Sequence, residues 1–352
     1  VTPQVQGAEF LDVAAHPLAV FEAAILADGA GGHVAEGTLA LRGAVVPVRL
    51  PFDLVIEGDV APVLLSVVDL ERYDPDVIIL QRQITDDRLE SMRRMGAFSR
   101  AFKIYELDDY LPNLPLKSIH RQDMPKDILK SMRRGFSLVD RLVVSTEALA
   151  DAYAGMHGDI RVVENCLPPE WWRALRGKRR AGARPRVGWA GGIGHTGDLE
   201  LIADVVKELA NEVEWVFFGM CPDWLRPYIS EFHPGVQIES YPMALSLLNL
   251  DLALAPLEQN LFNECKSNLR LLEYGACGVP VICSDVRCYQ GDGLPVMRVK
   301  NRFRDWVEAI RAHINDLDAA AKAGDELRAS VLNGWMLEGE NLEAWRRAWL
   351  PA

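Results

Sequence analysis

A glycine-rich stretch holds the first residues whose types and spacing suit chemistry. It reads GWAGGIGHTGDL over residues 188–199, where an apolar run ends and helical spacing begins. Glycines such as Gly191 and Gly192 let backbone N–H groups approach an anion closely, and the N-terminus of a helix attracts negative charge. His195 would then be placed to donate to a phosphate or a sugar hydroxyl. The alternative is a plain strand-to-helix turn, in which Asp198 caps the helix.

A second stretch combines a cation with the start of a helix. Residues 267–277 have helical spacing, and Gly278 ends the pattern. Lys266 comes directly before this helix, and Ser267 or Asn268 is suited to cap it. A cation beside free helix N–H groups can bind a diphosphate.

Two charged residues follow on the same helix. Arg270 and Glu273 are three positions apart and share one face. They suit an ion pair on a surface helix. They equally suit a site in which Glu273 accepts hydrogen bonds from a ribose diol. The residue chemistry alone leaves both interpretations open.

Two adjacent carboxylates, Asp108 and Asp109, follow an apolar run that ends at Leu107. If that run is a parallel strand, its carboxyl end is where ligands bind. The pair can serve as a helix cap, a solvated turn, a metal site or a catalytic group.

The cysteines and histidines do not suggest a metal centre. The six cysteines contain no Cys-x-x-Cys pair, and the seven histidines contain no His-Glu-x-x-His. We therefore expect no metal and no cofactor. This cysteine usage is typical of a reducing compartment, so we expect a cytoplasmic protein.

Short apolar runs alternate with helical patterns from about residue 50 onwards. Runs that are apolar throughout and separated by helices predict parallel sheets covered on both faces, and so an α/β fold. The expected strands are Val77–Leu80, Phe102–Leu107, Leu142–Ser145, Arg161–Glu164, Val187–Ala190, Val213–Gly219, Val236–Tyr241, Leu250–Pro256 and Val279–Ser284.

The chain is long enough for about two domains. Residues 173–186 interrupt the strand and helix rhythm, and seven of these fourteen residues are basic. We interpret them as a solvated linker about which the domains close, with an anion-binding patch as the alternative. The expected division is a first Rossmann-like domain 1–172, the linker 173–186, a second such domain 187–333, and a C-terminal helix 334–352. A further strand is plausible at Val45–Leu50.

Charge and hydropathy exclude several classes of partner. The formal net charge is −12, from 50 acidic and 38 basic side chains, which disfavours binding to nucleic acid. No apolar run reaches the roughly 18–20 residues that span a bilayer. The sequence begins with Val1 and not with Met, so we expect either a fragment of a longer chain or a processed product.

Four motifs, taken together, resemble the GT-B-fold glycosyltransferases. They resemble in particular the retaining, family-4-like group of O-antigen, capsule and glycoprotein synthesis. The similarity covers roughly residues 75–350. The motifs are IYELDDYLP, VDRLVVSTEALADAY with RVVENCLPPEWW, GWAGGIGHTGDL, and KSNLRLLEYGACGVPVICSD.

This resemblance implies two Rossmann-like domains that face a cleft, with the last helix crossing back to the first domain. It implies transfer of a hexose from a UDP- or GDP-sugar to an acceptor hydroxyl, with retention and without a metal, in polysaccharide biosynthesis. The acceptor would be a glycan, a lipid-linked glycan or a protein. Peripheral contact with a membrane stays open.

The resemblance also implies roles for single residues. Glu273 would hold the ribose, and Lys266, Ser267 and Asn268 would contact the diphosphate and sugar. Arg270 is a further candidate for binding the donor. The first loop of the second domain would lie beside the phosphates. Asp108 and Asp109 would reach the transferred sugar. The matching residues of that loop are Gly191, Gly192 and His195.

The sequence departs from the family pattern at three places. The Arg and Lys that usually follow the first loop of the donor domain are missing, and His195 and Lys266 are the candidates to replace them. The family's first glutamate falls on Cys265, and Glu264 is one residue early, so either Glu264 is the catalytic carboxylate or this subgroup lacks it. The glycine-rich acceptor loop has only one candidate, residues 29–33. A missing carboxylate would suit a catalytically silent sugar-nucleotide-binding module of a larger assembly. A sugar-nucleotide epimerase on the same scaffold is a further alternative.

Overall fold

The structure is a computed structural model of the 352-residue chain. The described residues are, for the backbone alone, 20–27, 33–41 and 44–52, and, for backbone and side chains, 74–115, 121 and 124–351. The chain forms two compact units, Val1–Leu64 and Leu65–Ala352.

The smaller unit contains a three-stranded antiparallel sheet in the order β1-β2-β3. Its strands are β1 (Val20–Ala27), β2 (His33–Leu41) and β3 (Ala44–Phe52). The strand predicted at Val45–Leu50 is confirmed as part of β3. Residues 29–32 of the candidate acceptor loop lie outside the described residues.

This antiparallel sheet changes the expected start of the first domain. Antiparallel strands close on short turns, whereas parallel strands need a long crossover. The expected domain 1–172 therefore differs from the structure, in which the parallel sheet belongs to the unit that begins at Leu65.

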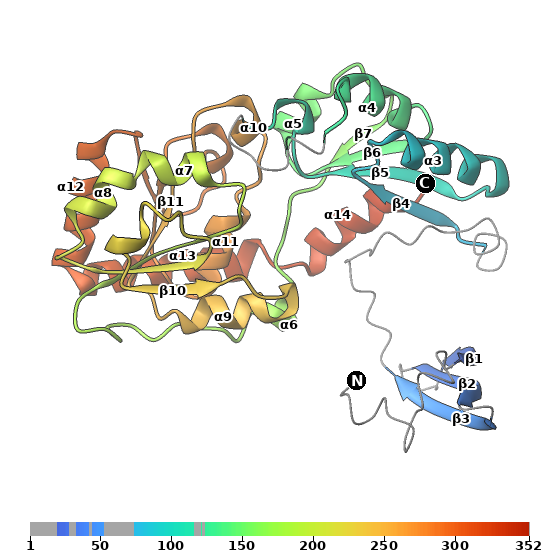
Figure 1. Cartoon of the computed structure of the whole chain (residues 1–352), viewed down its shortest axis with the longest axis horizontal. Helices are drawn as coiled ribbons and strands as arrows, with labels where there is room; N and C mark the ends of the chain where they lie inside the picture. Colours follow the sequence, from blue (N-terminus) through green and yellow to red (C-terminus); the bar gives the residue numbers. More distant parts are fainter. Residues whose placement is uncertain are drawn as a thin grey trace. The chain divides into compact units, whose positions relative to one another are not determined.

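The larger unit has two lobes, each built on its own parallel sheet (Figure 1). We call residues 74–167 together with the C-terminal helix the first lobe. Its sheet has the order β4-β5-β6-β7. Its strands are β4 (Val77–Gln81), β5 (Phe102–Leu107), β6 (Arg141–Val144) and β7 (Ile160–Val162), and its helices are α3 (Asp86–Phe98), η1 (Leu111–Asn113), α4 (Ile128–Phe136) and α5 (Glu147–Ala152).

We call residues 168–338 the second lobe. Its six-stranded parallel sheet has the order β10-β9-β8-β11-β12-β13. The strands are β8 (Arg186–Gly191), β9 (Glu214–Gly219), β10 (Glu231–Pro234), β11 (Leu252–Ala255), β12 (Val281–Ser284) and β13 (Met297–Val299). The helices are α6 (Pro169–Trp172), α7 (Thr196–Leu201), α8 (Ala203–Glu208), α9 (Tyr241–Leu247), α10 (Leu261–Glu264), α11 (Leu269–Ala276), α12 (Phe303–Asn315) and α13 (Leu317–Gly334), with short 3-10 turns between some of them.

The strand order of the second lobe reverses between β8 and β11. The chain runs outward from β8 to β9 and β10, then returns to place β11 on the other side of β8. Such a reversal opens a crevice beyond the carboxyl ends of the two strands, which is where open α/β sheets bind ligands. The loops that follow β8 and β11 border this crevice.

One predicted strand is wrong. Residues 236–241 form the 3-10 turn η4 (Ile238–Ser240) and the start of α9, and the edge strand β10 lies earlier. Val236 and Ile238 alternate as in a strand, but both are largely exposed, and Pro242 is fixed at a helix start. The short strand β13 was not predicted. The other predicted strands are confirmed.

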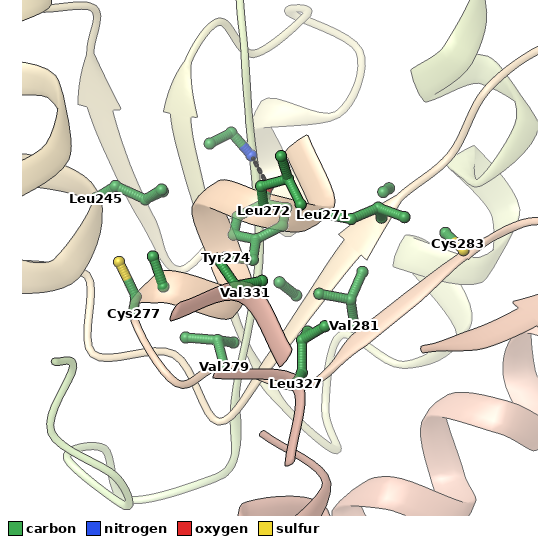
Figure 2. Packing of buried hydrophobic residues seen from close by; sticks show 14 of the residues in the cluster. Leu245, Leu271, Leu272, Tyr274, Cys277, Val279, Val281, Cys283, Leu327 and Val331 are labelled. Atoms are coloured by element: carbon green, nitrogen blue, oxygen red, sulfur yellow. Dashed lines mark hydrogen bonds between the residues drawn. The ribbon is translucent and has the colours of Figure 1, made fainter. Parts of the chain in front are cut away.

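The core of the second lobe fixes α11 against the sheet. Leu271 and Leu272 pack with Val281 of β12 and with Leu327 of α13, as Figure 2 shows. A Cβ on Gly275 would lie 2.8 Å from Val331 Cγ2, so glycine permits this close packing of α11 and α13.

One polar contact in this core ties α11 to the central strand. Tyr274 is buried, and its hydroxyl accepts a hydrogen bond from the Ala190 N–H of β8 at 2.7 Å. The last turn of α11 is thereby tied to the end of β8.

The basic segment 173–186 is bonded to the second lobe and is not a solvated hinge. Arg176 and Arg179 pair with Asp325 of α13, and Arg180 pairs with Asp318. Further contacts join its backbone to the same lobe, including Gly177 N–H to the Cys277 carbonyl and Arg180 N–H to Asp251. These arginines are therefore occupied within the protein.

The chain crosses between the lobes at two adjacent places. Leu167 and Met336 form a parallel bridge, so the outward and the returning segment lie side by side. Trp172 already packs in the core of the second lobe. The boundary between the lobes thus lies near residue 167 and not at residue 172.

The last helix, α14 (Gly339–Trp349), packs on the first lobe as expected (Figure 1). Trp345 and Trp349 pack against the β-sheet cluster that includes Ile104 and Val143. The Trp349 indole N–H donates to Glu106 at 3.0 Å. No described helix is both long and apolar enough to cross a membrane.

One buried cation fastens this helix. The Arg141 side chain is 7% exposed, pairs with Asp159 at 2.9 Å, and donates to the Arg347, Ala348 and Leu350 carbonyls at the end of α14. Because a helix leaves its last carbonyls without partners, Arg141 both satisfies them and complements the helix dipole.

Replacement of Arg141 by alanine should therefore release α14. We expect a loss of about 3 kcal/mol in the free energy of unfolding, because Asp159 and the helix carbonyls lose a charged donor. Arg161→Ala is the matched control, since Arg161 binds the same Asp159 but its side chain is 57% exposed. That change should cost at most about 0.5 kcal/mol. Urea denaturation, with hydrogen exchange of α14, measures both; equal losses would contradict the role of Arg141.

Candidate functional site

The loop after β8 brings its backbone close to α11. Gly191 ends β8, and a Cβ there would lie 2.5 Å from the Trp189 ring and 2.7 Å from the Arg270 guanidinium. Only glycine therefore fits at Gly191 without displacing these groups. Gly192 follows in a more open place, where a Cβ would meet no atom within 4 Å.

The same loop ends in a hydrogen-bonded pair. His195 Nδ1 lies 2.7 Å from Asp198 Oδ2, and Arg270 Nη2 lies 3.4 Å from His195 Nε2. A carboxylate at Nδ1 and a guanidinium at Nε2 favour the tautomer with hydrogen on Nδ1. Burial and the adjacent Arg270 lower the pKa of His195, so the ring is neutral at pH 7. In this arrangement His195 orients Arg270. Its donation to a phosphate or a sugar hydroxyl stays a prediction.

Asp198 is the hub of this network. It is buried inside α7, so it is not the helix cap considered above. Its Oδ1 accepts from the Glu258 N–H at 2.7 Å and from the Asn263 amide at 3.2 Å. Asp198 thus joins the loop after β8 to the loop after β11.

Lys266 lies between the two lobes, directly before α11. Its ammonium nitrogen is 3.3 Å from Asp109 Oδ1 of the first lobe and 4.5 Å from the centre of the Phe262 ring. Next to it, Ser267 Oγ accepts from the Asn165 amide at 3.0 Å. Asn268 holds the N-cap position of α11, but its amide donates to Asp292 at 3.2 Å.

The side chains of Arg270 and Glu273 take different partners. Arg270 donates to the Ala190 carbonyl and lies over the Trp189 ring. Glu273 Oε2 accepts from the Tyr241 hydroxyl at 2.9 Å. Both side chains are partly buried at the crevice, so the interpretation as a surface ion pair does not hold.

Glu273 is held in a poorly solvated place. Burial raises the pKa of Glu273 to about 7, although Arg270 and the Tyr241 hydroxyl oppose the shift. Near neutral pH the carboxyl group is therefore close to half ionised. A perturbed carboxyl group at a crevice is typical of functional sites.

The carboxylate pair of the first lobe faces this arrangement. Asp108 and Asp109 follow β5, and both bind Arg82, with Nη2 at 2.6 Å from Asp108 Oδ1 and 3.0 Å from Asp109 Oδ2. Asp109 also reaches Lys266, as described above. Asp109 therefore joins the ends of β4 and β5 to the start of α11.

These residues converge on one pocket. A cavity of about 200 Å³, which we call the inner pocket, brings together most of the predicted site residues from both lobes. They are Asp108, Asp109, His195, Lys266, Ser267, Arg270 and Glu273. The expected meeting of the His195 loop and the start of α11 is thus present in the structure.

A larger cavity adjoins it. This outer pocket of about 490 Å³ shares Asp109, His195 and Lys266 with the inner pocket. Gly192 lines the outer pocket but not the inner pocket. The two cavities together form a cleft between the lobes.

Glu264 and Cys265 lie outside the inner and the outer pocket. Cys265 is buried in the core of the first lobe, and its carbonyl accepts from the Thr146 hydroxyl at 2.8 Å. Glu264 lines a third cavity of about 560 Å³, which shares Lys266 and Ser267 with the inner pocket. Neither residue lines the inner or the outer pocket in the described part of the chain.

Three residues of the site were not predicted from the sequence. Arg82 follows the carboxyl end of β4 and has a positive φ of 49°. Its position just after a predicted parallel strand could have indicated a site residue, because ligands bind at the carboxyl ends of such strands. Tyr241 was assigned to a strand, which hid its position beside Glu273. Phe262 carries no motif, and only the fold brings it to Lys266.

No group of three or more His, Cys, Asp or Glu side chains is placed to hold a metal ion among the described residues. The cations of the cleft are instead Arg82, Lys266 and Arg270. They are side chains that can bind phosphate oxygens.

Comparison of the whole fold identifies similar solved structures, whereas no protein-family model and no curated protein sequence matches the chain. TarM is 16% identical, with a TM-score of 0.59 over 90% of this chain. Sucrose-phosphate synthase from Thermosynechococcus elongatus is 14% identical, with a TM-score of 0.58 and coverage of 80% of this chain and 76% of its own. Anabaena Alr3699/HepE in complex with UDP and glucose is 12% identical, with a TM-score of 0.57 and coverage of 80% of both chains.

These likenesses, together with the two parallel sheets, show the GT-B fold that the sequence motifs predicted. This chain spans only 64% of the length of TarM. At identities of 12–16% the comparisons show the fold alone.

Because burial raises the pKa of Glu273, ionisation of its carboxyl group should destabilise the folded state. The folded state retains a proton that the unfolded state loses, so stability falls as pH rises from about 4.5 to about 7. Glu273→Gln keeps an acceptor for Tyr241 and removes this cost, so its melting temperature should exceed that of the parent at pH 8. The gain should reach about 3 kcal/mol and shrink towards pH 4.5. Glu326→Gln, at an exposed site on α13, is the control; a gain independent of pH would refute the assignment.

Proposed function

We propose that this protein transfers a sugar, of the hexose type, from a nucleoside-diphosphate sugar to an acceptor hydroxyl. The observation that carries the proposal is the inner pocket, where Lys266, Arg270 and Glu273 of the second lobe face Asp109 of the first. The pocket lies at the strand-order reversal of the sheet, where α/β folds bind nucleotides. A structure of the same fold contains UDP and glucose, which supports a UDP-sugar as the donor; a GDP-sugar is the other candidate.

The donor diphosphate would bind between the loop after β8 and the start of α11. Lys266 offers an ammonium group, and the N–H groups at the start of α11 add the positive end of a helix dipole. Arg270, fixed by Ala190 and His195, supplies a second cation. Glu273 would accept hydrogen bonds from the ribose hydroxyls.

These groups would favour departure of the leaving group. As the bond from the sugar carbon C1 to the phosphate oxygen breaks, the nucleoside diphosphate leaves with the electron pair and gains negative charge. Fixed cations placed there stabilise that charge more in the transition state than in the ground state. Because Lys266 and Arg270 supply this charge, we propose a metal-independent reaction.

The acceptor oxygen would form the new bond to C1 and lose its proton. Asp109 is the candidate for the proton acceptor, and Asp108 for a group that orients the sugar. Arg82 holds both carboxylates at the mouth of the cleft. We propose retention of configuration, as in the family that the motifs resemble.

The broader setting follows the same resemblance. We propose a role in polysaccharide or O-antigen synthesis, on a glycan, lipid-linked or protein acceptor. All six cysteines are free, which supports a cytoplasmic location.

A second candidate function is a catalytically silent sugar-nucleotide-binding module. Burial of Cys265 in the first lobe supports it, because this position holds a carboxylate in the family pattern. Such a module would bind the donor tightly and never turn it over. Release of UDP from UDP-glucose, with and without acceptor, separates the two functions.

The first test is donor binding. At 100 times its dissociation constant, UDP-glucose should stabilise the protein by about 2.7 kcal/mol, seen as a higher melting temperature. Glu273→Ala should weaken this binding about 30-fold, because a charge-assisted hydrogen bond to the ribose is lost. A protein that no UDP- or GDP-sugar stabilises would contradict the proposal.

The second test concerns the leaving group. Lys266→Ala should lower kcat about 100-fold or more and change KM for the donor much less, because the ammonium acts on charge that develops during transfer. Lys322→Ala on the exposed face of α13 is the control. A loss confined to KM would assign Lys266 to binding alone.

A further inference from the structure

The outer pocket is lined by apolar side chains as well as by charged ones. Its apolar side chains come from both lobes: from the loop after β4, from η1 and the residues that follow it, from the loop after β8, and from α10. They are Ile84, Leu111, Leu114, Met124, Ile193 and Phe262. Among the described residues, these six side chains offer a molecule in this pocket hydrocarbon to pack against.

The polar residues that also line the pocket already have partners within the protein. Asp198 and Asn263 bond to one another, and Arg82 binds Asp108 and Asp109. These side chains are therefore engaged within the protein. An apolar body against the six apolar side chains would gain from burial, whereas a glycan there would have to leave water for hydrocarbon contacts.

The outer pocket opens into the inner one at Asp109, His195 and Lys266. A ligand in the outer pocket thus presents one end to the place where the proposed transfer occurs. At about 490 Å³ the pocket has the size of a cavity that holds a drug-sized molecule.

We infer that the acceptor is an alcohol carried on an apolar body, such as an aryl alcohol, with its hydroxyl towards Asp109. This inference rests on the proposed sugar transfer and names its acceptor class. The apolar body lies against η1 and Phe262, and the hydroxyl is the only polar group that the charged end must bind.

Ile193 offers a direct probe of this pocket. It lies at the tip of the glycine-rich loop and is 56% exposed, so its side chain is not required by the core. Its place among the lining residues gives it a role in contact with the acceptor.

The experiment compares acceptors at a fixed UDP-glucose concentration, with products identified by mass spectrometry. We expect transfer to 1-naphthol with kcat/KM at least tenfold above that for methyl glucoside or maltose. Ile193→Asn should lower kcat/KM for 1-naphthol about tenfold, as a lost apolar contact does. Leu247→Asn is the matched control, because Leu247 is 64% exposed on α9 and lines neither pocket.

The outcomes separate this inference from the function on which it rests. If UDP-glucose binds and the sugar acceptors react as well as 1-naphthol or better, the acceptor class is wrong and the sugar transfer stands. If Ile193→Asn and Leu247→Asn have equal effects, the outer pocket is not the acceptor site. If UDP-glucose neither stabilises the protein nor is turned over, the proposed function fails and the inference fails with it.

Discussion

The site depends on one short segment of the second lobe that the first lobe holds. Cys265 is buried in the first lobe's core, and the Thr146 hydroxyl binds its carbonyl. The next residues are therefore fixed from both sides, with Ser267 bound by Asn165 and Lys266 by Asp109. Burial of a small side chain sets the position of a cation, and the start of α11 follows from it. A site built across two lobes needs such a fixed point, because positioning errors of about 1 Å weaken catalysis.

The position of Glu273 at the inner pocket explains why a carboxylate is retained there although its charge is unfavourable. Glu273 lies where its ionised form is poorly solvated, and the Tyr241 hydroxyl and Arg270 compensate only in part. A better-solvated glutamate would stabilise the fold more, but it would not face a ligand in the inner pocket. Residues that destabilise a fold are commonly found where function requires them. Asp198 differs, because three partners satisfy it and it serves the site only through His195 and the two loops that it joins.

Periodicity was sufficient to predict the fold, because buried parallel strands are apolar along their whole length, as β6 and β12 are. It failed at residues 236–241, where alternating residues are exposed and a proline starts a helix. The positions of Lys266 and Glu273 could be predicted from their spacing, because Glu273 lies in α11 and Lys266 shortly before it. Tertiary contacts could not be predicted: the place of Cys265, the partners of Arg82 and the tautomer of His195 depend on packing that no local pattern encodes.

Movement of one lobe relative to the other depends on which connecting segments are bonded to a lobe and which are not. The arginines of residues 173–186 are bonded to α13 and to the second sheet, so this segment moves with the second lobe. The covalent crossings are instead the paired strands at Leu167 and Met336. The contact of Lys266 with Asp109 lies where the inner and the outer pocket meet. Separation of the lobes at this point would break that ion pair and the neighbouring contact of Ser267 with Asn165, so the relation of the lobes and the charge of the cleft are coupled by the same contacts.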